Sequence, residues 1–157
     1  MLAAIVIGVL LGLLVTIPSI RKKEDAAIKV TKDALGASEV VMIEPRTTAM
    51  GFEPTSANGV KAMCCLTASA TDLMAVSWSN RTEWRIARSA ITKVDTEAPD
   101  PASVQKASIL ITYTTPEGDE VLARFRLKDP VPWLTELGYD WGPEGPPVLE
   151  DDDADDD

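Results

Sequence analysis

Short runs of alternating apolar and polar residues occupy most of the chain between residues 38 and 127. At residues 120–128, the odd-numbered positions are apolar, whereas Arg124, Arg126 and Lys128 occupy even-numbered ones. A period of two is typical of a strand with one buried face. Turn-forming clusters recur about every eight to twelve residues, which favours an antiparallel sheet over alternating strands and helices. We expect a mainly β domain with strands at residues 39–45, 46–54, 60–68, 73–78, 82–87, 89–95, 108–114 and 120–127.

Two segments outside the strand-like region have the spacing of short helices. In residues 21–37, aliphatic side chains recur every three or four positions, and Gly36 suits the end of a helix. After residue 129, apolar side chains again fall at helical spacing, with prolines at the start and Gly138 at the end. We expect the first helix to link the domain to a preceding segment and the second to cover the open end of the sheet.

Residues 1–20 carry no charge, and Arg21, Lys22 and Lys23 follow them directly. A signal peptide would have a basic start and a small-residue cleavage site, and a buried helix in so small a protein would have a polar face. A transmembrane anchor fits better, because about 20 apolar residues cross a bilayer. The positive-inside rule predicts an outside amino terminus and a cytoplasmic remainder in the cell membrane. The expected organisation is an anchor at 1–20, a juxtamembrane linker helix at 21–37, a β-domain at 38–141 and a disordered acidic tail at 142–157.

The charge distribution argues against nucleic acid as a partner. The net charge is −10, but the last eight residues carry seven acids, so residues 21–149 have a net charge of only −3. Neither part has the basic surface that binding to a phosphate backbone needs. The chain has no histidine, and its two cysteines are adjacent, so no metal site, cofactor site or small-molecule substrate is indicated.

The order of these elements resembles a bacterial pleckstrin-homology-like (PH or GRAM-type) domain. The similarity lies in "GVKAMCCLTASATDLMAVSW", "TEWRIARSAITKVD", "ILITYTTPEGDEVLARFRL" and "PVPWLTEL", and it covers roughly residues 38–138. The resemblance implies a bent antiparallel barrel or sandwich closed by a carboxy-terminal helix. It also implies a binding or scaffold module rather than an enzyme. Members that bind phosphoinositides use basic residues in an early loop, and Lys61 alone matches that pattern here.

We therefore expect a membrane-tethered module that engages a protein partner or a second copy of itself, as an accessory component of a membrane complex. The residues expected at a partner surface are aromatic or basic: Trp78, Arg81, Trp84, Arg85, Arg124, Arg126 and Lys128. Trp78 and Trp84 flank a tight turn and are expected to meet across a hairpin. The same residues are also compatible with a purely structural role, as a tryptophan pair and solvated strand charges.

Two other functions stay open at this point. One is a membrane-bound serine or cysteine hydrolase that uses Cys64, Cys65, Ser77 or Ser89, with Lys93 as a base. No motif supports it, and an apolar strand is a poor setting for a reactive thiol. The other is a domain that binds a lipid headgroup.

Overall fold

The computed structural model describes residues 20–36, 40–53, 61–98, 107–143 and 145–147. The expected membrane span, apart from Ile20, and the acidic residues 150–157 lie outside these ranges. Within them, no helix is both long enough and apolar enough to cross a membrane.

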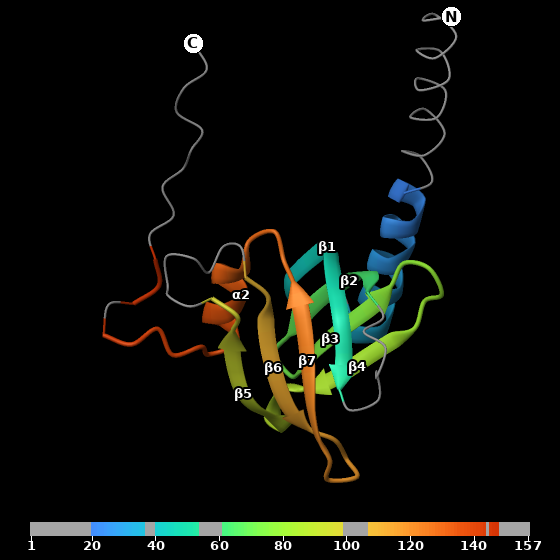
Figure 1. The fold of residues 1–157 in the computed structure, drawn as a ribbon. Helices are drawn as coiled ribbons and strands as arrows, with labels where there is room; N and C mark the ends of the chain where they lie inside the picture. The colour runs from blue at the N-terminus through green and yellow to red at the C-terminus, as the bar shows by residue number, and fades with distance from the viewer. Residues whose placement is uncertain (1–19, 37–39, 54–60, 99–106, 144, 148–157) are drawn as a thin grey trace, which may run out of the picture.

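The described strands form one antiparallel sheet with the order β4-β3-β2-β1-β7-β6-β5 (Figure 1). The strands are β1 (Val40–Glu53), β2 (Ala62–Ser69), β3 (Asp72–Ser77), β4 (Glu83–Ala87), β5 (Ile91–Thr96), β6 (Ile109–Thr114) and β7 (Glu120–Arg126). A short 3-10 turn, η1 (Arg88–Ala90), joins β4 to β5, and α2 (Pro130–Glu136) follows β7. The mainly β prediction is confirmed. The described sheet is not closed into a barrel, because β4 and β5 are its two unpaired edges.

The first two expected strands are one continuous strand, β1. The pairing of β1 with β2 shifts register between Glu44 and Thr47, so Pro45 and Arg46 lie in an irregular stretch of the strand. A proline has no backbone N–H for the ladder and is tolerated at a bulge. The interpretation of Pro45 as a strand end was therefore wrong: β1 bends at this point and continues.

The sheet is bent, and its inner faces enclose the main core. Figure 1 shows β5, β6 and β7 lying in front of β2, β3 and β4. Leu66, Leu73, Ile111 and Phe125 from these two parts belong to one buried cluster. The helix α2 adds Trp133 and Leu134 to the same cluster, so it packs against the main core.

Residues 20–35 form a helix, called here the N-terminal helix, that lies on the outer face of β2 and β3 (Figure 1). Ala27, Thr31 and Leu35 are buried at intervals of four residues. Ala27 and Leu35 share a second core cluster with Cys65, Met74, Val76 and Trp78. The Thr31 hydroxyl can be buried because it donates to the Ala27 carbonyl oxygen at 2.9 Å. The helix expected at 21–37 is therefore a packed part of the domain, and it ends before Gly36, whose φ is +76°.

Candidate functional site

A groove of about 630 Å³ lies between the start of the N-terminal helix and the β3–β4 turn. We call it the helix–hairpin groove. Its apolar residues include Ile20 and Met63, which are 43% and 44% exposed, together with the buried Trp78. Its charged residues are Lys23, Arg46 and Lys61.

Three separate parts of the chain supply the cations of this groove. Lys23 comes from the N-terminal helix, Arg46 from the irregular stretch of β1, and Lys61 from the residue before β2. Arg46 is held by Glu24, with 2.8 Å between its Nη2 and the Glu24 Oε2. Among the described lining residues there is no Asp or Glu, so the charged side chains that line the groove are all basic.

Trp78 is fixed in place by a hydrogen bond to β1. Its Nε1 donates to the Pro45 carbonyl oxygen at 3.1 Å, and its side chain packs in the cluster beneath the N-terminal helix. Trp84 pairs with Ala75 across the β3–β4 ladder and packs against the main core on the other face of the sheet. The two tryptophans therefore pack in different core clusters, although both line the helix–hairpin groove.

A second groove, of about 680 Å³, lies where edge strand β4 and η1 approach the β6–β7 turn. We call it the edge groove. Its lining includes Asp72, Arg85, Ser89, Tyr113, Thr115 and Glu117. It combines both signs of charge with a tyrosine ring and the backbone of an edge strand.

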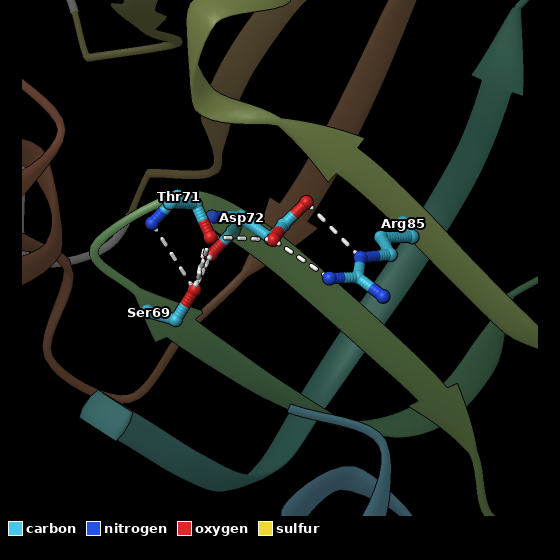
Figure 2. A network of polar contacts seen from close by, with 4 residues as sticks. All are labelled: Ser69, Thr71, Asp72 and Arg85. Atoms are coloured by element: carbon cyan, nitrogen blue, oxygen red, sulfur yellow. Dashed lines mark hydrogen bonds and ion pairs between the residues drawn. The ribbon is translucent and has the colours of Figure 1, made fainter. Parts of the chain in front are cut away.

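Asp72 and Arg85, which line the edge groove, belong to a polar network at the β2–β3 turn that Figure 2 shows. The Ser69 hydroxyl accepts the backbone N–H of Asp72 at 2.9 Å and that of Thr71 at 3.3 Å. The Asp72 carboxylate accepts from the Thr71 hydroxyl at 2.7 Å and binds Arg85 in a two-point ion pair, with distances of 3.0 and 2.8 Å. The pKa of Asp72 is lowered mainly by the hydrogen bonds from Arg85 and, to a smaller extent, by the one from Thr71. The carboxylate therefore stays charged and keeps the turn and β4 together.

The other basic residues expected at a partner surface do not form one site. Arg81 has a φ of 60° and donates from Nη1 to the Trp78 carbonyl oxygen, so it stabilises its own turn. Arg124 pairs with Glu97 at 2.8 Å. Arg126 and Lys128 are exposed on β7 and just after it, and in the described part of the chain no ion pair is formed by either. Of the seven expected residues, the helix–hairpin groove contains only Trp78 and Trp84, and the edge groove contains only Arg85.

Both cysteines, Ser77 and Lys93 are in surroundings that do not suit a nucleophile or a base. Cys64 and Cys65 are fully buried, and burial raises the pKa of Cys64 to about 12 and also raises that of Cys65. Ser77 is buried and within 3.0 Å of the Ser79 hydroxyl. Lys93 pairs with Asp95 at 2.6 Å, and this interaction raises the pKa of Lys93, whereas a lysine base needs a lowered one. Across the residues that the structure describes, no group of three or more acidic or cysteine side chains could hold a metal ion.

No protein-family model matches this chain, and no curated protein matches its sequence. The fold defines its class as mainly β, and the two grooves are its candidate binding sites.

Neither groove is recognisable as a unit from the sequence. Lys23 flanks the apolar segment and Lys61 is an isolated base, and no local pattern connects them with Arg46 or Met63. The one usable signal was Met63, which alternation places on the same face of β2 as Cys65 and opposite the core residue Cys64. Asp72 carried no signal, because its role depends on an arginine 13 positions away.

Proposed function

We propose that this protein is a membrane-tethered, PH-like binding module that faces the cytoplasm and engages a protein partner through the edge groove. The observation that carries the proposal is this groove's location beside β4, an unpaired edge of the described sheet. Edge strands present backbone N–H and C=O groups that can pair with an extended peptide, while neighbouring pockets receive its side chains.

The PH-like architecture is supported by the chain order. Two antiparallel groups of strands, β1–β4 and β5–β7, follow each other in sequence, meet through β1 and β7, and are followed by a helix that enters the core. A module of this kind is a platform for binding, and its specificity depends on its loops and edges.

The membrane tether is supported by the charge-free residues 1–20 and by the basic residues after them. Arg21, Lys22 and Lys23 are all exposed on the first turns of the N-terminal helix. Basic residues just beyond an apolar span favour the cytoplasmic side.

The edge groove suits a peptide that offers both an extended backbone and polar side chains. Glu117 and Ser89 are exposed at its rim, and the Tyr113 ring is half-buried in its wall. The ion pair of Asp72 and Arg85 keeps this wall rigid, so little ordering is needed when a partner binds.

A hydrolase is less well supported. Its two cysteines are buried thiols with raised pKa values, and its lysine is held as a cation by Asp95. Neither arrangement supplies an activated nucleophile.

Photo-crosslinking in intact cells tests the protein partner. A photoreactive benzophenone amino acid in place of Ser89, at the edge groove, should give one discrete crosslinked product after illumination. The same replacement at Lys32, exposed on the N-terminal helix and outside both grooves, should give none. Mass spectrometry of the product then separates a second copy of this chain from another protein. Equal labelling at both positions, or none at Ser89, would contradict the proposal.

Reporter fusions test the predicted orientation in the membrane separately. A reporter enzyme that works only in the cytoplasm should be active when it is fused to the carboxy terminus, and a reporter that works only outside the membrane should be inactive there. A fusion that is active only outside the membrane would overturn the predicted orientation without bearing on the edge groove.

A further inference from the structure

We propose that the helix–hairpin groove binds the headgroup of an anionic phospholipid of the membrane to which the chain is tethered. This inference rests on the proposed membrane anchor, and it is independent of the proposed protein partner at the edge groove.

The position of the groove is the first argument. Ile20, the last residue of the expected span, lines the groove, and so does Lys23, one helical turn later. Residues 20–35 are one helix, so these two side chains are separated by only about 4.5 Å along the axis. If the apolar segment ends at the membrane surface, the groove lies at the level of the lipid headgroups.

Charge is the second argument. Lys23, Arg46 and Lys61 line the groove without a carboxylate among its described lining residues, although residues 21–149 are net acidic. Arg46 is partly neutralised by Glu24. Lys23 and Lys61 are exposed, and neither forms an ion pair with any residue that the structure describes. Two available ammonium groups beside an arginine fit a phosphate-bearing anion.

The apolar part of the groove is the third argument. Met63 and Ile20 are two of the three large hydrophobic side chains that are exposed among the described residues. They lie beside the Trp78 ring, in the same groove as the cations. This mixture suits the membrane interface, where tryptophan is enriched and where basic side chains meet anionic lipids. A soluble anion would gain nothing from Met63 and Ile20, so we assign the site to a lipid.

The site differs from the loop-based lipid site that the resemblance implies. In that pattern Lys61 stands alone. Here its partners are Lys23, from a helix preceding the β-domain, and Arg46, from the bend in β1.

Native mass spectrometry of the full-length chain, released from detergent micelles, tests the proposal. Phosphatidylglycerol and phosphatidylcholine are added separately at equal concentrations, and the retained lipid is measured. A double substitution, Lys23→Gln with Lys61→Gln, removes both available cations. Lys29→Gln with Lys32→Gln is the matched control, because it removes the same charge from exposed positions of the same helix outside the groove. Circular dichroism melting confirms that both variants remain folded.

Wild-type protein should retain phosphatidylglycerol about tenfold better than phosphatidylcholine, since each lysine near an anionic lipid strengthens the binding of that lipid. The groove variant should lose most of this preference, and the control should keep it within about twofold. Equal losses in both variants, or no preference in the wild type, would overturn the site. Competition by soluble glycerol phosphate at the concentration of the lipid would instead assign it to a free anion. Extraction of the wild-type chain from cell membranes by alkaline carbonate would show that the anchor, not the groove, had failed.

Discussion

Arg88 and Glu136, which are 48 positions apart in the sequence, form an ion pair with 2.7 Å between Nη1 and Oε1. The same guanidinium donates to the Ser69 carbonyl oxygen at 3.0 Å and to the backbone carbonyl of Glu136. One side chain thus joins the end of β2, the η1 turn and the end of α2. It connects α2 to the sheet.

Arg88→Lys should lower the free energy of unfolding by about 1–2 kcal/mol, because a lysine cannot reproduce these several hydrogen bonds at once. Urea unfolding of the full chain in mild detergent, followed by circular dichroism, measures the loss. Arg126→Lys is the control, since Arg126 is exposed on β7, and a change below about 0.5 kcal/mol is expected there. Equal effects of the two substitutions would argue against the three-point contact.

The Asp72–Arg85 pair predicts a specific dependence of stability on pH. The folded pKa of Asp72 is lowered by its hydrogen bonds from Arg85 and Thr71, so the charged carboxylate stabilises the fold. This contribution is complete above the unfolded pKa of about 4 and disappears as the pH falls through the lower folded value. Since the Arg85 side chain is 55% exposed, the pair contributes about 1 kcal/mol or less.

Asp72→Asn should therefore be less stable than wild type at pH 7, and the difference should shrink below about pH 4. Unfolding in urea at pH 7, 5 and 3 provides the comparison. Asp119→Asn, at an exposed turn residue, is the control and should change little at any of these values. A difference between wild type and Asp72→Asn that stays constant down to pH 3 would show that the ion pair is not its source.

Trp78→Phe should lower the free energy of unfolding by at least about 1 kcal/mol, because a buried aromatic ring is retained but it is smaller than the indole and cannot donate to Pro45. Trp141→Phe is a matched control. It also removes an indole hydrogen bond, at 3.2 Å to the Thr135 hydroxyl, but that bond is exposed to water. Chemical denaturation should find a clearly smaller loss for this control. The reverse order would mean that the link from Trp78 to the bend in β1 does not stabilise the fold.

Cys64 and Cys65 should resist alkylation in the folded protein at pH 8. Both thiols are buried, and the pKa of Cys64 is about 12, so almost no thiolate is present at that pH. Iodoacetamide should modify both cysteines in urea and neither without it, as counted by intact mass. Rapid native labelling would show that β2 opens readily.

The raised pKa of Cys64 also predicts that the fold is less stable at high pH. The unfolded thiol ionises near pH 8.5, whereas the folded Cys64 thiol stays neutral up to about pH 12, so rising pH favours the unfolded state across this interval. Comparing wild type with Cys64→Ala at pH 8 and pH 10.5 isolates this contribution. The loss of stability between pH 8 and pH 10.5 should therefore be larger in the wild type than in the variant.

Local patterns in the sequence determined most of the secondary structure. Alternation in residues 120–128 predicted the buried Val121, Ala123 and Phe125 of β7, because the strand period is fixed by backbone geometry. Gly138, with a φ of +81°, lies just after α2 as expected, since glycine adopts this conformation without steric cost. The bend at Pro45 was misread because a bulge depends on the register of the neighbouring strand, which no local pattern encodes.

Only the tertiary structure decided where the grooves lie and which charges are available. It packed Trp78 and Trp84 into different core clusters, paired Arg85 with Asp72 and Arg88 with Glu136, and brought Lys23 and Arg46 to Lys61. These relationships join residues that are far apart in the chain, and their distances depend on how the sheet bends and where the N-terminal helix packs. The sequence by itself therefore determined which segments become strands and helices, through short-range periodicity and steric preference. The fold alone decided which side chains meet, because charge and packing act through space rather than along the chain.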